Sequence, residues 1–237
     1  MIDIKNDAIR VLNVSKQFGY FFALTNISFN VKERAIYGIA GANGAGKTTL
    51  IKILAGLLKP SGGSVKIMEL NYREHANQIK KVIGITSDES FLFNELTIFE
   101  NLKYYDNLHC NFNTKEIQEK ITGFAKLFNI DDWLSEPIRN LSHGMKQKVE
   151  LIRAMIHQPK ILLLDEPFRG LDYKTIQLLI KLLVNLKEKS NSSLILSTHN
   201  IELLMQICDN LLVLKQGKVN KIFLDKAFNE GEIKKYF

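Results

Sequence analysis

Apolar residues follow two different patterns along the chain. Short apolar runs bounded by turn residues are typical of strands, and two of the later runs are almost wholly apolar, as strands buried in a parallel sheet are. The predicted strands cover residues 9–12, 27–31, 36–40, 161–164 and 194–197. Two further runs, 211–214 and 219–223, flank Gln216 and Gly217 and predict a hairpin.

Helical spacing marks much of the remaining chain. Between residues 97 and 158, apolar residues recur every three or four positions, as in helices with one buried face. The same spacing runs from Leu50 to Leu58, where Gly56 and Pro60 close the segment. A further helix is predicted at 174–189.

These patterns predict one domain that spans residues 1–237. An α/β core of residues 1–88 and 156–237 would carry a helical insertion at 89–155. The chain shows no internal repeat and no low-complexity linker.

The composition agrees with a globular α/β protein and argues against several other classes. The chain has 237 residues, a net charge of +7 and 46% hydrophobic residues. Its basic residues are scattered, with no basic run interleaved with aromatics, so no nucleic-acid partner is expected. No apolar run approaches the roughly 18 residues that cross a bilayer. Cys110 and Cys208 lack metal-site spacing and predict free, buried thiols.

Residues 41–48 read Gly-Ala-Asn-Gly-Ala-Gly-Lys-Thr and match the phosphate-loop pattern G-x-x-x-x-G-K-T. An apolar strand precedes them and a helix follows, an arrangement that directs backbone N–H groups and a helix N-terminus at an anion. The sequence therefore predicts that this loop binds a nucleotide. The residues predicted to contact it are Gly41, Asn43, Gly44, Ala45, Gly46, Lys47, Thr48 and Thr49.

Two carboxylates, Asp165 and Glu166, follow a wholly apolar strand. Next to a phosphate loop, such a strand places its Asp where it holds Mg²⁺ through water, while Thr48 ligates the ion directly. Glu166 would reach the water that attacks the terminal phosphate. Capping of the next helix is the alternative explanation of an acid pair, and the upstream phosphate loop makes it the weaker one.

Residues 141–147 read Leu-Ser-His-Gly-Met-Lys-Gln and precede the acid pair by about 20 residues. With this segment the chain resembles the ATP-binding-cassette ATPases, whose signature usually reads L-S-G-G-Q at this distance. Ser142 is also a good N-cap for the apolar-faced helix that follows. His199 ends a strand about 34 residues after Asp165, where the family has its switch histidine. The resemblance covers residues 9–223, with the motifs in family order.

The resemblance implies an α/β fold in which a P-loop NTPase core carries an N-terminal antiparallel β subdomain and an inserted α-helical subdomain. It also implies that Phe18 stacks on adenine, with Tyr20, Phe21 and Phe22 as alternatives. Lys47 would hold the β- and γ-phosphates.

Further roles follow from the same resemblance. Glu166 would be the general base, and His199 would steady the γ-phosphate and the attacking water. Ser142 and Gly144 would contact the γ-phosphate held by the opposite subunit. Asp172 matches the loop through which each subunit senses the other's site.

Two segments depart from the family pattern. His143 and Met145 stand where Gly and Gln are usual, but the two phosphate-contacting positions survive, so the signature is expected to work. Asp88 stands where the family has a neutral Gln that contacts the metal and the attacking water, so the resemblance makes Asp88 a candidate contact of both Mg²⁺ and the nucleotide, and Glu89 follows it. An Asp is shorter than Gln and adds negative charge beside an anionic ligand. We expect Asp88 or Glu89 to link the nucleotide state to a membrane partner, with altered coupling.

The resemblance implies an ATPase that uses ATP and Mg²⁺. Two copies of the chain, or the chain and a paralogous ATPase subunit, would sandwich two MgATP molecules and drive a separate transmembrane permease. The continuation of the signature favours export, on the cytoplasmic face of the cell membrane. The helical insertion, which opens with Phe91, Leu92 and Phe93, is the expected docking surface. The alternative is a soluble cassette ATPase for cofactor assembly or nucleic-acid work, without transport.

Overall fold

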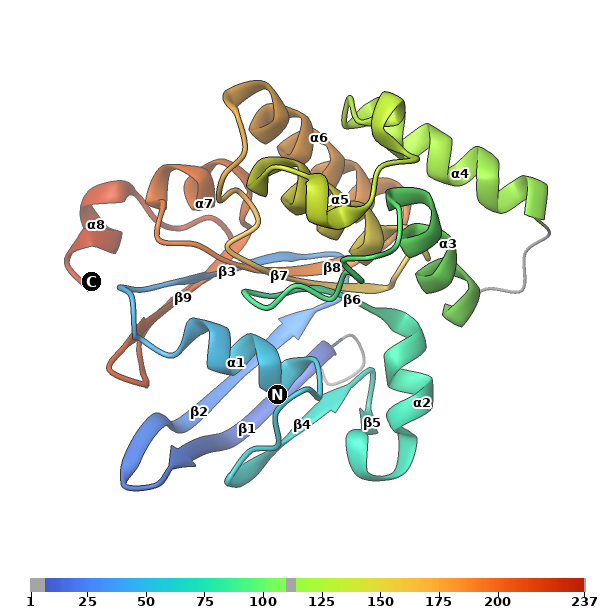
Figure 1. The fold of residues 1–237 in the computed structure, drawn as a ribbon. Coiled ribbons are helices and arrows are strands. Elements are labelled where there is room, and N and C mark those ends of the chain that lie inside the picture. Colours follow the sequence, from blue (N-terminus) through green and yellow to red (C-terminus); the bar gives the residue numbers. More distant parts are fainter. Residues whose placement is uncertain (1–6, 110–113, 237) are drawn as a thin grey trace.

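Two β-sheets organise the protein in a computed structural model that describes residues 7–109 and 114–236 (Figure 1). In this part of the chain, six strands form one sheet in the order β10-β9-β3-β8-β7-β6, and four form another in the order β2-β1-β4-β5. The larger sheet contains β3 (Ile36–Ala40), β6 (Ile83–Thr86), β7 (Ile161–Asp165), β8 (Ser193–Ser197), β9 (Asn210–Lys215) and β10 (Lys218–Phe223). The smaller sheet contains β1 (Asp7–Phe18), β2 (Phe21–Lys32), β4 (Gly62–Ile67) and β5 (Leu70–Asn71).

The larger sheet is parallel except at β10. Strand β3 pairs in parallel with β8 and β9, and β7 pairs in parallel with β6 and β8, whereas β10 pairs antiparallel with β9. Every residue of β3, β7 and β8 is buried, as expected for parallel strands covered on both faces. The carboxyl ends of parallel strands meet at one edge of a sheet. This edge therefore collects the phosphate loop after β3, the acid pair at β7 and His199 after β8.

Helix α1 (Lys47–Leu54) lies between the two sheets (Figure 1). Its apolar side chains belong to one core cluster with side chains from both sheets. The helix ends at Leu54, before the apolar pattern does: Gly56 takes a left-handed conformation with φ of 70°, and Leu57 is half exposed. The buried residues of α1 are Lys47, Leu50, Ile51, Ile53 and Leu54.

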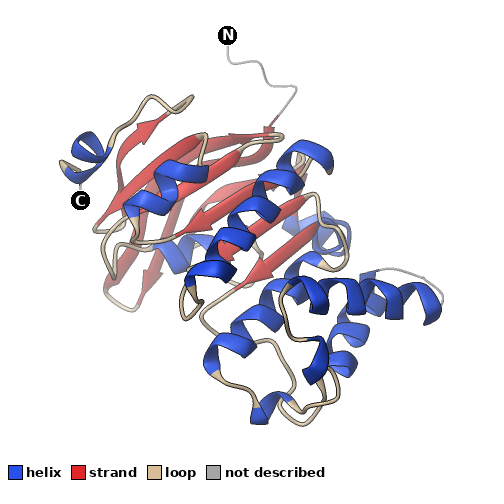
Figure 2. Ribbon diagram, turned by 90° about the horizontal axis from the view of Figure 1, so that it is seen from above, coloured by secondary structure: helices blue, strands red, loops and turns tan. Residues whose placement is uncertain are grey.

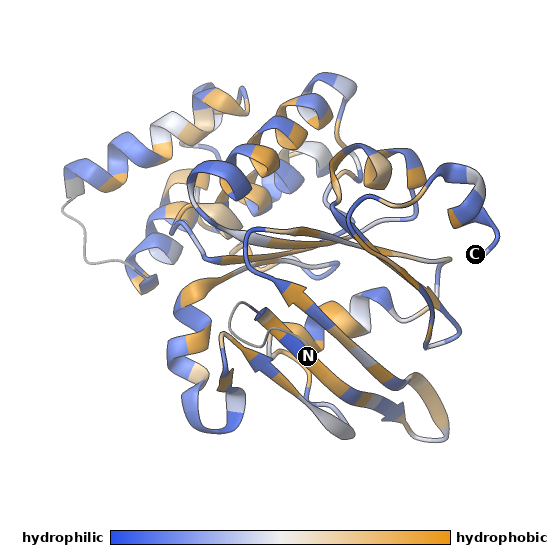
Figure 3. Ribbon diagram, turned by 180° about the vertical axis from the view of Figure 1, so that it is seen from behind, coloured by the Kyte–Doolittle hydropathy of each residue, from blue (hydrophilic) through white to orange (hydrophobic). Residues whose placement is uncertain are grey.

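Helices cover the other face of the larger sheet, as the view from above shows (Figure 2). Two of them, α3 and α4, extend to one side, where α3 contacts α5. Apolar residues concentrate on the strands and on the helix faces turned toward them (Figure 3). These helices are α3 (Ile98–His109), α4 (Thr114–Leu127), α5 (His143–Met155), α6 (Tyr173–Lys189), α7 (Ile201–Ile207) and α8 (Glu230–Lys234), with short 3₁₀ turns at Asp131–Trp133 and Ile138–Asn140.

The predicted fold class is confirmed: an α/β P-loop core carries an antiparallel β-sheet and a helical segment between β6 and β7. The predicted strands, the hairpin and the helix at 174–189 are also confirmed. The pattern missed β4, β5 and α2 (Tyr72–Val82), because α2 buries only Ile79 and β4 buries only Val65 and Ile67. The subdomain boundaries at residues 88 and 156 stay predictions.

Two smaller expectations concern the cysteines and the membrane. Cys208 is free and buried, as predicted, whereas Cys110 lies outside the described residues. Among residues 7–109 and 114–236, no helix is both long enough and apolar enough to span a membrane.

Candidate active site

The phosphate loop connects β3 to α1 through a turn that only glycine fits. Gly46 has φ of 104°, and a Cβ atom there would lie 2.7 Å from Leu24 Cδ2 and 2.8 Å from the carbonyl oxygen of Ala23. No side chain caps the start of α1. The N-terminus of this helix is therefore open to an anionic ligand, whose charge the helix dipole favours.

Lys47 is held over the loop by backbone carbonyls. Its Nζ donates to Gly41 O at 2.8 Å and to Ala42 O at 3.1 Å, and the residue is only 6% exposed. Burial lowers the pKa of Lys47, while the charges of Glu166 and Asp165 oppose that shift. The ammonium group is thus aimed at the cavity and is costly to leave without an anionic partner.

A cavity of about 590 Å³ lies beside the loop. It brings together residues from five separate stretches of the sequence. Ten predicted site residues line it: Phe18, Asn43, Gly44, Gly46, Lys47, Thr48, Thr49, Asp88, Asp165 and Glu166.

Two predicted loop residues do not line the cavity but hold its lining residues in place. Gly41 supplies the carbonyl that holds Lys47. Ala45 is buried, and its carbonyl oxygen accepts a hydrogen bond from Gly217 N at 3.1 Å, which ties the loop to the β9–β10 hairpin.

The acid pair is fixed by Ser197 at the end of the neighbouring strand β8. Ser197 Oγ donates to Asp165 Oδ1, and the N–H of Glu166 donates to Ser197 O at 3.1 Å. Asp165 is almost fully buried, so its carboxylate has a defined position. Neither carboxylate caps α6. The N-cap of that helix is Asp172, so helix capping does not explain the acid pair.

Glu166 and His199 form a direct pair at the edge of the sheet. His199 Nδ1 lies 3.0 Å from Glu166 Oε1, and the His199 side chain is 66% exposed. A carboxylate at the cavity wall with an imidazole beside it suits a general base whose orientation is fixed by a neighbour.

The oxygen ligands needed for Mg²⁺ are present. Thr48 follows Lys47 in the first turn of α1, Asp165 ends β7, and both line the same cavity. Hydroxyl and carboxylate oxygens are hard ligands of the kind that Mg²⁺ prefers. The side chains present therefore fit this ion.

Aromatic residues form part of the cavity lining. Phe18 and Phe21 both line it, from either side of the turn between β1 and β2. Tyr20 is fully exposed at the tip of that turn, and neither Tyr20 nor Phe22 lines the cavity. The structure thus leaves Phe18 and Phe21 as candidates to stack on a base, and the choice between them stays a prediction.

The signature segment lies at the N-terminus of α5. Ser142 is exposed and caps the helix, accepting a hydrogen bond from Met145 N at 3.3 Å, as predicted. Gly144 packs so closely on Gly170 that a Cβ atom would lie 2.8 Å from its carbonyl oxygen. His143 lines the cavity, but Ser142 and Gly144 do not, so within one chain they contact no part of it.

Asp172 also stands outside the cavity of its own chain. Its two carboxylate oxygens accept from Thr175 N and Thr175 Oγ1, each at 2.9 Å. The backbone hydrogen bond from Thr175 holds the pKa of Asp172 below its ordinary value. Within one subunit Asp172 is an N-cap, and its role toward a second subunit stays a prediction.

Asp88, the departure from the family pattern, lines the cavity and is paired with Lys52 of α1. Lys52 Nζ lies 3.0 Å from Asp88 Oδ1, and Ser87 Oγ donates to the same carboxylate at 2.8 Å. Partial burial raises the pKa of Asp88, but the hydrogen bonds from Lys52 and Ser87 outweigh it and hold that pKa below its ordinary value. Glu89 does not line the cavity.

Sequence reasoning missed several residues of the site. Gln147 lines the cavity, and its Nε2 donates to Pro167 O at 3.2 Å, and Arg169 lines the cavity as well. Gln147 stands one helical turn after His143, and Lys52 one turn after Thr48. For Gln147, the four-residue spacing from His143 on the helix was an available signal, whereas the partners of Lys52, Asp88 and Glu89, are distant in sequence.

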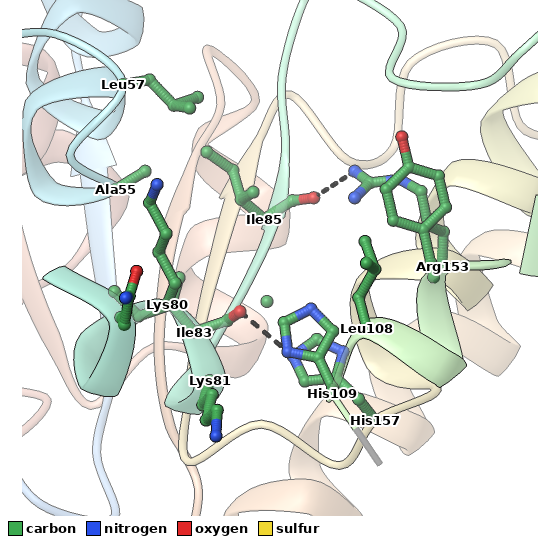
Figure 4. A pocket seen from close by; sticks show the side chains of 13 residues that line it. Ala55, Leu57, Lys80, Lys81, Ile83, Ile85, Leu108, His109, Arg153 and His157 are labelled. Carbon is green, nitrogen blue, oxygen red and sulfur yellow. Dashed lines mark hydrogen bonds between the residues drawn. The ribbon is translucent and has the colours of Figure 1, made fainter. Parts of the chain in front are cut away.

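A second cavity, of about 490 Å³, separates α2 from α3 and α5 (Figure 4). On its floor the rings of His109 and His157 stack with centroids 4.0 Å apart, and His157 Nε2 lies 3.0 Å from Ile83 O. Burial, followed by the charge of His109, lowers the pKa of His157 to about 4. Arg153 donates to Ile85 O across the cavity (Figure 4).

The fold and the first cavity define a P-loop protein that binds a nucleoside triphosphate and carries a carboxylate placed for its hydrolysis. Residues 24–169 match the model of the ABC transporter family. The ABC transporter ATP-binding protein MJ1023 of Methanocaldococcus jannaschii is 37% identical over 210 residues, which cover 89% of this chain and 75% of that protein.

Two further similarities bear on function. The sulfate/thiosulfate import ATP-binding protein CysA of Mannheimia succiniciproducens is 33% identical over 225 residues, covering 91% of this chain and 61% of CysA. The dimeric post-hydrolysis structure of the cassette MJ0796 bound to ADP and Pi matches with a TM-score of 0.86 and 26% identity, covering 93% of this chain and 100% of that one. The chain belongs to the ABC transporter family as an ATP-binding subunit, and its activity is ATP hydrolysis.

Proposed function

We propose that this subunit dimerises around two MgATP molecules and drives export of a substrate through a separate transmembrane permease. The position of Ser142 and Gly144 supports the proposal most strongly. Ser142 caps α5 and Gly144 lies in its first turn, but neither lines the cavity of its own chain. A helix N-terminus favours anions, so the phosphates in the cavity of a second copy or a paralogous subunit are its natural ligand. The dimeric structure of the related cassette supports this arrangement.

Each catalytic side chain then has a defined task. Lys47 binds the β- and γ-phosphates, and Glu166 accepts the proton of the attacking water. His199 does not line the cavity of this structure but pairs with Glu166, and its predicted contact with the γ-phosphate and the attacking water stays part of the proposal. Thr48 and Asp165 are the residues that would hold Mg²⁺, which when bound neutralises charge on the phosphates. Such positioning and neutralisation supply most of the catalysis of phosphoryl transfer.

The second cavity is the proposed docking site of the permease. Its rim exposes Leu57 (50%) and Leu108 (55%), and Lys80, Lys81 and Arg153 line it. We therefore expect a short cytoplasmic helix of the permease, with an apolar face and an acidic end, to bind there. With the permease bound there, the subunit would lie on the inner face of the cell membrane.

The residues predicted to form the docking surface differ in their exposure to solvent. Leu92 is buried and cannot contact a partner directly, while Phe93 is 46% exposed and packs against Tyr104 with ring centroids 5.2 Å apart. Phe93 thus extends the apolar surface of the helical segment beyond the cavity.

The direction of transport rests on the signature alone. The sequence Gly-Met-Lys-Gln at 144–147 favours export, whereas the similar protein CysA is named as an import protein. Transport of candidate substrates into inverted membrane vesicles that contain the subunit and its permease tests the direction.

Purification from detergent-treated membranes tests the partner. A polytopic membrane protein is expected to co-purify with the chain, and Leu108→Glu, at the cavity rim, is expected to release it. Leu127→Glu on α4 is the matched control, because Leu127 is also exposed but lies outside the cavity. Purification of the chain with no membrane protein would favour the soluble, transport-independent ATPase.

A further inference from the structure

Lys52 connects the helix of the phosphate loop to the acidic pair that departs from the family pattern. Its Nζ lies 3.0 Å from Asp88 Oδ1 and 3.0 Å from Glu89 Oε1. Lys52 follows Thr48 by one turn of α1, so both project from the same side of the helix. One ammonium group therefore serves two carboxylates at the edge of the nucleotide cavity.

The two carboxylates are not equivalent. Asp88 lines the nucleotide cavity, whereas Glu89 does not, and the Glu89 side chain is 77% exposed. A carboxylate at the cavity wall repels a triphosphate unless a cation neutralises it. The Asp88 side chain is 52% exposed as well, so its place in the cavity lining, and not burial, distinguishes it from Glu89.

The segment that carries Asp88 is anchored at both ends. Lys52 holds its start to α1, while Ser90 Oγ and the N–H of Phe91 both donate to Glu150 of α5, each at 2.7 Å. Glu150 is in turn paired with Arg153 at 2.8 Å. These contacts hold the backbone on either side of Asp88 close to α1 and α5, and Lys52 is the cation that meets the Asp88 carboxylate at the cavity.

We propose that Lys52 is a positioning residue of the nucleotide site, which neutralises Asp88 and fixes it at the cavity wall so that a triphosphate binds despite the added carboxylate. Lys52 acts through Asp88 and touches no reacting atom. The inference rests on ATP binding by this chain and is independent of the permease, the direction of transport and dimerisation.

Equilibrium binding of a fluorescent ATP analogue to the purified chain tests the proposal, in EDTA and again with Mg²⁺. In EDTA, Lys52→Gln is expected to raise the Kd about 5- to 10-fold, because Asp88 is left unneutralised, and the ADP analogue should be affected less. In the Asp88→Gln background the same substitution should change the Kd less than about 2-fold. Under steady-state hydrolysis, the KM should rise more than kcat falls.

Matched variants separate this role from a structural one. Glu89→Gln removes the other partner of Lys52 and should leave the Kd within about 2-fold, while Lys52→Arg keeps the charge and should restore binding. Asp88→Gln alone should tighten binding in EDTA, and this variant tests the repulsion by Asp88 even where Lys52→Gln fails to fold, while Lys52→Arg and Glu89→Gln test the role of Lys52. Equal losses from Lys52→Gln with and without Asp88, or weaker binding by Asp88→Gln, would overturn the proposal.

Discussion

Glu166 adopts a left-handed backbone conformation, with φ of 44°, directly after the buried strand β7. For a residue with a side chain this conformation costs on the order of 1–3 kcal/mol. Hydrogen bonds from the Glu166 N–H to the carbonyl and the hydroxyl oxygen of Ser197 offset the cost. The turn directs the carboxylate out of the sheet and toward His199, where a general base is needed.

Replacing Glu166 tests that role. Glu166→Gln is expected to lower the steady-state rate of ATP hydrolysis by about 10²–10⁴-fold, the range that a general base contributes, while the Kd for ATP stays nearly unchanged. Glu188→Gln, at an exposed position of α6, is the control for a change in charge alone. If Glu166→Gln hydrolysed ATP at the wild-type rate, another group would have to be the general base.

A second prediction at this scale concerns His157 and pH. Because burial depresses its pKa to about 4, the unfolded chain binds more protons than the folded chain between pH 4 and the ordinary value of 6.5. His157 therefore contributes its full stability above about pH 6.5 and loses it as pH falls toward about 4, at up to roughly 1.4 kcal/mol per pH unit.

Urea unfolding at several pH values measures this dependence. His157→Gln is expected to flatten the fall in the free energy of unfolding between pH 6.5 and 4, whereas His75→Gln on α2, outside the stacked pair, should leave it in place. The groups that face His157 are His109, Arg153 and Lys120, and the charges of all three disfavour its protonation. An unchanged slope in His157→Gln would contradict the assignment.

Single residues were predictable where a motif fixes both their type and their neighbours. Lys47, Thr48, Asp165 and Glu166 follow from strand, turn and helix signals that are local in sequence, and all four line the cavity. Lys52 was not predictable, because its partners are brought to it only when β6 and α1 pack in the folded chain.

Among the secondary-structure elements, the N-termini of three helices position most of the functional residues. Helix α1 opens with a glycine turn and no side-chain cap, α5 with Ser142, and α6 with Asp172. A capped start is a stable structural end, whereas the uncapped start of α1 is left open for a ligand. The uncapped start of α1 thus faces the phosphate site of its own chain, whereas the capped start of α5 lies outside that site and is proposed to face the phosphates of a second chain.

Variants of Asp172 test the cap of α6. Asp172→Ala is expected to lower the free energy of unfolding by about 1 kcal/mol, while Asp172→Asn, which also caps well, should cost a few tenths at most. Chemical denaturation measures both. A larger effect of either variant on ATP hydrolysis than on stability would instead support the predicted contact with a second subunit.

Elements were predictable in proportion to the apolar surface that they bury. Strands β3, β7 and β8 are buried throughout and stand out in the sequence, as does the long helix α6. The edge elements β4, β5 and α2 bury too few side chains to show a period. The short β5 also depends on its pairing with β4, and no local sequence pattern predicts that pairing.

At the scale of the whole molecule, the site is divided between two places. The cavity with Lys47, Asp165 and Glu166 lies at the carboxyl edge of the larger sheet, and Ser142 lies outside that cavity at the start of α5. In the proposed dimer, two chains arranged head to tail would bring each part to its complement, so that each ATPase site would be made by two subunits.

A mixing experiment tests this claim most directly. Lys47→Ala removes the phosphate-binding group, and Ser142→Asp keeps the helix cap but places a carboxylate toward the partner's phosphates, so each variant alone should be inactive. Mixed together, they form heterodimers in which one of the two composite sites is intact. The account predicts ATPase activity of about a quarter of the wild-type value in the mixture after random exchange of subunits. A mixture no more active than the separate variants would contradict a shared site.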